Sequence, residues 1–281
     1  MSRPLPTQSH HHTTAVGYTQ QLDVFRPTGT HRRGAVLVFH GGGWRTGAPR
    51  DVHDRAAALA GLGFTAIAPS YRLLHEAPWP APVEDLRAAL GWVRAHAEEL
   101  DIEPMHIAVQ GHSAGGHLAL LSGTLDTSER PAAIVAYYAP IGFHPVPAPA
   151  TGTLRKEDLI LDEAGRMPSW MIFPSGDASA QALEDASPLA RLTADFPPTA
   201  LLHGTSDNGL HQRSSVLLNS RLSELGVPSS LHVYAGRNHE FDRAPTMLAA
   251  TSRDVALFLD CYMTDRKRIQ AEAEQYPFPA K

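Results

Sequence analysis

The sequence of 281 residues has little that ties it to an oxidising compartment, a membrane or a nucleic acid. Cys261 is the only cysteine, so no intrachain disulfide can form, which suits a reducing cytoplasm. The longest apolar run, near residues 132–143, is too short for a membrane span, and the first residues lack the apolar segment of a secretory signal. The formal net charge of −5 gives no basic field for nucleic acid. We therefore expect a cytoplasmic protein with no nucleic-acid or membrane partner.

Metal and nucleotide motifs are missing as well. The chain has neither H-E-x-x-H nor a cluster of Cys and His at ligand spacing, and no G-x-G-x-x-G follows a predicted strand. The triplet at residues 10–12 could bind a metal weakly, but a disordered polar terminus explains it better. We expect no metal and no cofactor.

The composition is that of an ordinary globular protein. Hydrophobic residues make up 43% and charged residues 19%, which excludes intrinsic disorder. Strand-like and helix-like segments alternate, the pattern of an α/β fold with a mostly parallel central sheet and helices on both faces. The predicted strands are 21–25, 34–40, 65–71, 106–110, 132–138, 199–203 and 231–234, and the predicted helices are 51–62, 82–100, 114–125, 210–225 and 247–262.

This alternation suggests one domain with two tails. We expect a flexible N-terminal segment at 1–19, one α/β domain at 20–264, and a C-terminal tail with a frayed helix at 265–281. Within the domain, residues 140–198 are rich in proline and poor in periodicity. This stretch is predicted to be a small irregular insertion, either a cap or lid over a site or a surface excursion.

A nucleophile motif lies between the strand 106–110 and the helix 114–125. The sequence Gly111-His112-Ser113-Ala114-Gly115 fits G-x-S-x-G, in which a sharp turn projects the serine above the sheet. The glycines leave room for the tight packing of strand and helix, and the helix N-terminus directs N–H groups towards the serine. This context predicts that Ser113 is a nucleophile.

A glycine-rich loop follows the strand 34–40. The sequence His40-Gly41-Gly42-Gly43-Trp44 lacks the Gly-Lys-Ser/Thr of a phosphate-binding loop. Acyl transfer needs N–H donors where the carbonyl oxygen becomes an oxyanion, and glycines let the backbone approach a substrate. We predict an oxyanion hole formed by the N–H groups of Gly42, Gly43 and Ala114.

A serine nucleophile needs a base, and the base needs an acid, in the chain order Ser…Asp…His for this fold. Asp207 follows the strand 199–203 and His239 follows the strand 231–234, so both are expected at the carboxyl edge of the sheet. Asp177 and Asp185 are competing acids, but no predicted strand end precedes them. Asp207 and His239 are therefore the predicted acid and base.

Together, these motifs resemble the α/β-hydrolase superfamily, and within it the small esterases of the hormone-sensitive-lipase and feruloyl-esterase-like group. The matching segments are HGGGW at 40–44, SYRL at 70–73, PAPVEDLRAALGWVRAHA at 80–97, GHSAGGHLA at 111–119, ASPLARL at 186–192, PPTALLHGTSD at 197–207 and NHEF at 238–241. The resemblance implies the same roles for Ser113, Asp207 and His239. The chain departs from the family after Asp207, where a turn with Pro or Val is common and Asn208–His211 stands here.

The function this implies is hydrolysis of a carboxylic ester through an acyl-enzyme, with a small-molecule ester or amide as substrate and a monomer or homodimer as the working unit. Arylformamidases share HGG-x-W and GHSAG, so a C–N hydrolase stays open, as does acyl transfer or cyclisation on the same residues. A non-catalytic binding protein is a third reading, which the complete Ser, Asp and His set opposes. Candidate pocket walls are Trp44, Phe143, His144, Trp170, Leu210 and Phe241.

Overall fold

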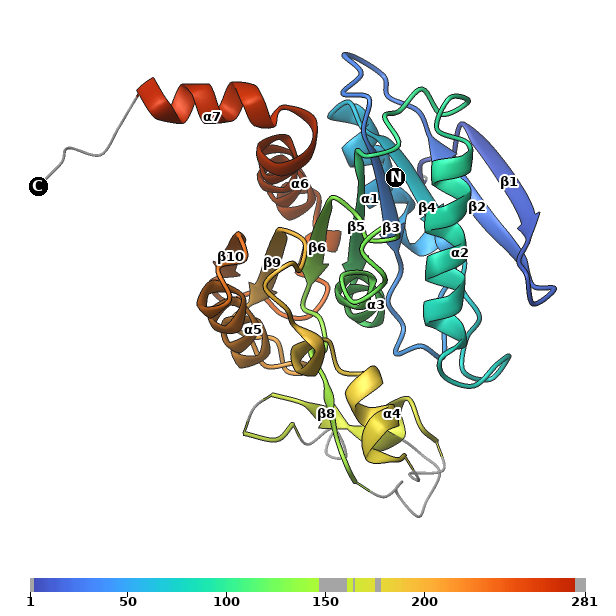
Figure 1. Ribbon diagram of the computed structural model, residues 1–281, viewed down its shortest axis with the longest axis vertical. Helices are drawn as coiled ribbons and strands as arrows, with labels where there is room; N and C mark the ends of the chain where they lie inside the picture. Colours follow the sequence, from blue (N-terminus) through green and yellow to red (C-terminus); the bar gives the residue numbers. More distant parts are fainter. Residues whose placement is uncertain (1–2, 147–160, 164, 175–177, 276–281) are drawn as a thin grey trace, which may run out of the picture.

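The computed structural model describes residues 3–146, 161–163, 165–174 and 178–275, which are built around an eight-stranded sheet (Figure 1). The strands lie in the order β1-β2-β4-β3-β5-β6-β9-β10. β1 and β2 pair antiparallel, as do β2 and β4, and the other neighbours pair parallel. The predicted mostly parallel sheet is confirmed. The bounds are β1 Gln8–Thr13, β2 Thr19–Phe25, β3 Ala35–Phe39, β4 Thr65–Pro69, β5 Ile107–His112, β6 Ala133–Tyr137, β9 Thr199–Gly204 and β10 Ser229–Tyr234.

The central strands are apolar on both sides because the sheet is covered on both sides. In β3, Ala35, Leu37 and Phe39 belong to one buried core, while Val36 and Val38 belong to the other. Successive side chains of a strand point to opposite faces, so a continuous apolar run is what such a strand requires.

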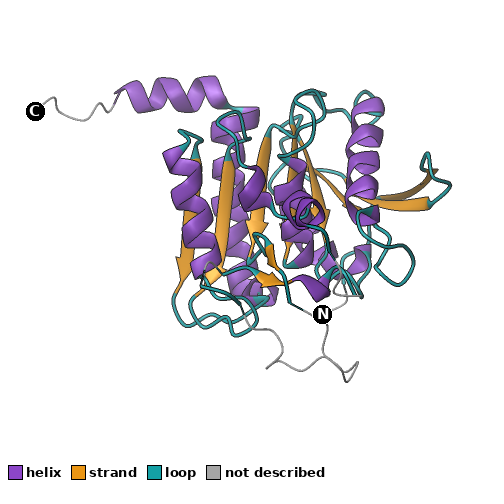
Figure 2. Ribbon diagram, turned by 60° about the horizontal axis from the view of Figure 1, so that its bottom comes forward, coloured by secondary structure: helices purple, strands orange, loops and turns teal. Residues whose placement is uncertain are grey.

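Helices cover the two faces of the sheet (Figure 2). α2 (Ala81–Ala95), α3 (Ala114–Ser122) and α5 (Arg213–Glu224) pack on one face, and α1 (His53–Gly61) and α6 (Pro245–Leu259) on the other. Leu86 of α2 and Leu118 of α3 are fully buried against the first face, as Leu259 of α6 is against the second. Each such burial contributes about 1.5–3 kcal/mol. The layers are those predicted.

The N-terminal residues differ from the flexible segment expected at 1–19. Gln8–Thr13 form β1 at the edge of the sheet, paired with β2. The strand is polar, so it has no apolar signature, and backbone pairing and side-chain contacts hold it instead. The Ser9 hydroxyl donates to Asp23 at 2.6 Å, and the His10 ring lies 4.9 Å from the Trp92 ring.

Short elements make up the described part of the insertion at 140–198. They are β7 Phe143–His144, β8 Met167–Pro168, the 3₁₀ turns η3 Ser169–Met171 and η4 Pro188–Arg191, and α4 Ala180–Asp185. The segment lies beyond one end of the sheet (Figure 1). Its role as a lid stays a prediction.

The remaining elements are the 3₁₀ turns η1 (Pro49–Val52) and η5 (Phe241–Arg243), the π-helical turn η6 (Asp260–Thr264) and α7 (Arg266–Gln275). α7 extends away from the sheet (Figure 1) and is the helix expected in the C-terminal tail. No helix in the described ranges has both the length and the apolar character to cross a membrane.

Candidate active site

The predicted site residues come together where four parallel strands end. The glycine loop follows β3, Ser113 follows β5, Asp207 lies three residues beyond β9, and His239 lies beyond β10. The carboxyl ends of these strands share one edge of the sheet, where ligands of open α/β sheets bind.

Ser113 has a strained backbone at the turn between β5 and α3. Its φ of 56° and ψ of −119° are unfavourable for a residue with a side chain. The neighbouring glycines are required by contact: a Cβ on Gly111 would lie 1.9 Å from the carbonyl oxygen of Gly115, and one on Gly115 would lie 2.3 Å from that of Phe39. A larger residue at either position would therefore force the backbone of the turn to shift.

Ser113, His239 and Asp207 form a continuous chain of hydrogen bonds. His239 Nε2 lies 3.0 Å from Ser113 Oγ, and His239 Nδ1 lies 2.7 Å from Asp207 Oδ2. A carboxylate only accepts, so Nδ1 carries the ring proton and the lone pair of Nε2 faces the serine hydroxyl. This tautomer can take a proton from Ser113.

Asp207 is held as a buried carboxylate, with 1% of its side chain exposed. Its Oδ1 accepts from the N–H groups of Gly209 at 2.9 Å and Leu210 at 2.8 Å. Its Oδ2 also lies 3.4 Å from His203 Nε2. Burial raises the pKa of Asp207, but the hydrogen bonds from His203, His239 and the Leu210 N–H outweigh burial and hold this pKa well below its ordinary value.

His203 is a site residue that the sequence analysis missed. It is fully buried at the end of β9, with Nε2 2.7 Å from the Leu210 carbonyl oxygen and Nδ1 2.8 Å from the Ser215 hydroxyl. Nε2 therefore carries the proton, which also faces Asp207. Its place in the HGTSD segment, four residues before Asp207, was the available signal.

A small apolar cavity of about 200 Å³ opens at Ser113 and His239. Of the predicted oxyanion donors, Gly43 and Ala114 line it. Gly42 lines a second, more polar cavity of about 400 Å³ instead, together with His112 and Glu240. The loops at the ends of β3, β5 and β10 thus each place a residue in the polar cavity and the next or preceding residue in the apolar one.

The predicted pocket walls are partly corrected. Trp44 and Leu210 line the apolar cavity, whereas Phe143, His144, Trp170 and Phe241 do not. Phe143 lies behind Trp44, with 5.7 Å between ring centroids, and Phe241 packs on Tyr234 at 4.9 Å in the opposite core. An aromatic residue next to a motif can turn to either side of the sheet, and sequence adjacency does not decide which.

Four lining residues were not predicted: Pro140, Met167, Met171 and Gly209. Pro140, Met167 and Met171 come from the insertion, whose lack of periodicity gives no signal for which side chains turn inward. Of the competing acids, Asp185 is exposed on α4 and accepts from Gln181 at 3.1 Å, while Asp177 lies outside the described residues. In the described part of the chain, no cluster of three or more His, Cys, Asp and Glu could hold a metal.

The sequence is similar to a known family and to several known proteins. The sequence profile of the BD-FAE family matches residues 22–222. A probable carboxylic ester hydrolase of Mycobacterium tuberculosis, LipM, is 31% identical over 211 residues, covering 68% of this chain and 46% of LipM. The esterase LipC of the same organism is 28% identical over 278 residues, covering 91% of this chain and 65% of LipC. The chain thus spans about half to two thirds of the length of these relatives.

A solved structure supports the fold. The thermophilic esterase Est2 of Thermogutta terrifontis superimposes with a TM-score of 0.71 at 24% identity, covering 92% of this chain and 94% of that one. The predicted α/β-hydrolase fold is confirmed. Because the family profile covers most of the sequence, this chain belongs to the BD-FAE family of α/β-hydrolases.

Proposed function

We propose that this chain is a serine hydrolase that cleaves carboxylic esters with Ser113, His239 and Asp207. The observation that carries the proposal is the hydrogen-bonded chain from Ser113 Oγ through His239 to Asp207, at 3.0 and 2.7 Å, on a strained turn beside an apolar cavity. The ester hydrolases among the relatives support the same chemistry.

Acylation begins when Ser113 Oγ attacks the ester carbonyl while His239 Nε2 takes the hydroxyl proton. The imidazolium that forms is stabilised by the Asp207 carboxylate, which accepts from Nδ1 and stays ionised. His239 then gives the proton to the leaving alcohol, and the acyl group remains on Ser113.

The oxyanion of the tetrahedral intermediate needs fixed donors. Gly43 and Ala114 line the cavity at Ser113, and Gly42 directly precedes Gly43 on the glycine-rich loop after β3. Removing one such donor in other enzymes costs about 10²–10³ in kcat. Water, activated by His239, attacks the acyl-enzyme and releases the acid under the same donors.

The cavity size favours a short acyl group. About 200 Å³ walled by Trp44, Met171 and Leu210 offers apolar contact with few polar partners. We therefore propose short-chain esters as the substrate class on the acyl side.

The test is turnover of p-nitrophenyl esters from acetate to octanoate, with N-formylkynurenine as the amide probe and a fluorophosphonate as the label. Wild-type protein is expected to hydrolyse the short esters and to be labelled, and Ser113→Ala to do neither. Ser122→Ala is the matched control, because Ser122 is buried at the end of α3, the helix that follows Ser113, and its hydroxyl donates to the Ala119 carbonyl at 2.6 Å.

Each other result has a definite meaning. Labelling that persists in Ser113→Ala would assign another nucleophile. Faster turnover of the formamide would make the protein a C–N hydrolase. Absence of both turnover and labelling in the wild-type protein would favour the binding-protein reading. The cytoplasmic location and the monomer or homodimer stay predictions.

A further inference from the structure

A buried polar network lies behind His239 and is centred on Asp242. This residue lies three positions after His239 in η5, and 1% of its side chain is exposed. Its Oδ1 accepts from the Tyr138 hydroxyl at 2.5 Å, and its Oδ2 accepts from Arg55 Nε at 2.6 Å. His112 Nδ1 lies 3.2 Å from the same Oδ2. None of these contacts is used by the proposed hydrolysis.

The charge of Asp242 is fixed by its partners. Burial raises the pKa of this carboxyl, but His112 and Arg55 outweigh burial and hold the pKa far below its ordinary value. Gln110 Nε2 lies 3.1 Å from His112 Nε2, which leaves Nδ1–H to face Asp242. The network is thus an ionised carboxylate with three buried partners, a geometry that resists movement.

The network joins the two loops that carry the reacting groups. His112 directly precedes Ser113, and Asp242 lies on the loop of His239. Tyr138 packs its ring against the His239 ring with 4.5 Å between centroids while its hydroxyl binds Asp242. Its φ of 36° is unfavourable for an aromatic residue, so the surrounding contacts hold it in place.

We propose that Asp242 is a positioning residue that holds the His239 loop against the Ser113 turn and so maintains the 3.0 Å contact between Nε2 and Oγ. This inference rests on the proposed function. The side chains of Arg55, His112, Tyr138 and Asp242 do not line the apolar cavity, so loss of the network should lower kcat and leave KM unchanged.

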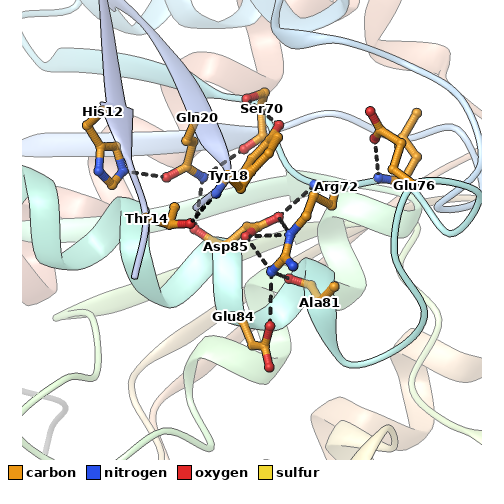
Figure 3. A network of polar contacts seen from close by, with 11 residues as sticks. His12, Thr14, Tyr18, Gln20, Ser70, Arg72, Glu76, Ala81, Glu84 and Asp85 are labelled. Atoms are coloured by element: carbon orange, nitrogen blue, oxygen red, sulfur yellow. Dashed lines mark hydrogen bonds and ion pairs between the residues drawn. The ribbon is translucent and has the colours of Figure 1, made fainter. Parts of the chain in front are cut away.

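A second buried network provides a matched control (Figure 3). Asp85 is as buried as Asp242, with 1% of its side chain exposed, and accepts from the Arg72 guanidinium at 2.8 Å. The Asp85 carbonyl also accepts from Gln20 at 2.9 Å, which ties α2 to β2. This network contacts neither Ser113 nor His239, so breaking it tests the effect of losing a buried ion pair alone.

The experiment compares kcat, KM and melting temperature for wild type, Asp242→Asn, Tyr138→Phe and Asp85→Asn with p-nitrophenyl acetate. Asp242→Asn is expected to lose about 10²-fold in kcat with KM unchanged, because a misplacement of about 1 Å has that effect. Tyr138→Phe, which keeps the ring and removes one donor, should lose less kcat in the same way. Asp85→Asn should lower the melting temperature and leave kcat unchanged.

Several results would overturn the positioning role. Wild-type kcat in folded Asp242→Asn would do so, as would an equal kcat loss in Asp85→Asn. If Asp242→Asn does not fold, wild-type kcat in Tyr138→Phe would be decisive against it. Absence of turnover that depends on Ser113 in the wild-type protein overturns the proposed function and this inference with it, so the two failures are distinguishable.

Discussion

Replacement of Asp207 by asparagine should disable the site by reversing the tautomer of His239. Asp207 Oδ1 accepts two backbone N–H groups, from Gly209 at 2.9 Å and Leu210 at 2.8 Å, and only an oxygen can keep both bonds. The amide nitrogen of Asn must then take the place of Oδ2, 2.7 Å from His239 Nδ1. Since that nitrogen is a donor, His239 must accept at Nδ1 and carry its proton on Nε2.

A protonated Nε2 cannot accept the Ser113 proton, so general-base catalysis is lost. The same change in a serine protease lowers kcat by about 10⁴, which corresponds to about 5–6 kcal/mol. We expect a loss of that size here, with KM nearly unchanged because Asp207 does not line the apolar cavity. The two retained backbone bonds should keep the variant folded.

The assay is steady-state hydrolysis of p-nitrophenyl acetate by Asp207→Asn, with circular dichroism to verify folding. Asp185→Asn is the control, since that exposed carboxylate accepts from Gln181, away from the apolar cavity, and should keep wild-type kcat. A folded Asp207→Asn protein with kcat within about tenfold of wild type would refute the tautomer argument.

Three further predictions follow from packing and burial. Met171→Ala enlarges the cavity and should favour longer acyl chains, by about fourfold in kcat/KM for each CH₂ accommodated. Met105→Ala is the control, because Met105 is exposed. An unchanged chain-length profile in Met171→Ala, or the same shift in Met105→Ala, would contradict this prediction. Gly115→Ala places a Cβ 2.3 Å from a β3 carbonyl oxygen and should lower the free energy of unfolding, measured in urea, by about 3 kcal/mol. Gly91→Ala is the control: this position on α2 faces open space, so the substitution should raise the free energy of unfolding by about 0.5–1 kcal/mol. Equal effects of the two substitutions would contradict the contact argument. Burial lowers the pKa of His117 to about 4 in the folded protein. Between that pH and about 6.5, the unfolded state therefore binds a proton that the folded state does not. The free energy of unfolding should fall by up to about 3 kcal/mol as the pH falls through this window. Urea denaturation of His117→Gln should show a weaker pH dependence there, and an identical one would count against His117 as the group.

Local patterns were sufficient for the central strands, for the helices that cover them and for the choice of the proposed catalytic residues. The apolar run of β3 predicts a strand covered on both faces, because the side-chain alternation of a strand leaves no other place for such residues. The turn at Ser113 is equally local, since Gly111 and Gly115 are required by contacts within about five residues or with the adjacent strand. Asp207 and His239 could be selected because chain order and strand ends restrict the choice.

Contacts between distant segments decided the rest. The polar strand β1 exists because β2 offers it an edge, and nothing in Gln8–Thr13 alone indicates burial. Met167 and Met171 reach the cavity from an insertion without periodicity, and Phe143 and Phe241 turn away from it.

The network of Asp242 shows the same division most clearly. Arg55, His112, Tyr138 and Asp242 are spread over most of the chain and carry no shared motif, yet they meet behind one histidine. The sequence by itself determined the fold class and the residues proposed for the candidate site, because strand periodicity and the turn at Ser113 depend on neighbouring residues. Only the tertiary structure decided the remaining cavity walls, the β1 edge and the buried charges, because those depend on which side chains face each other in the folded chain.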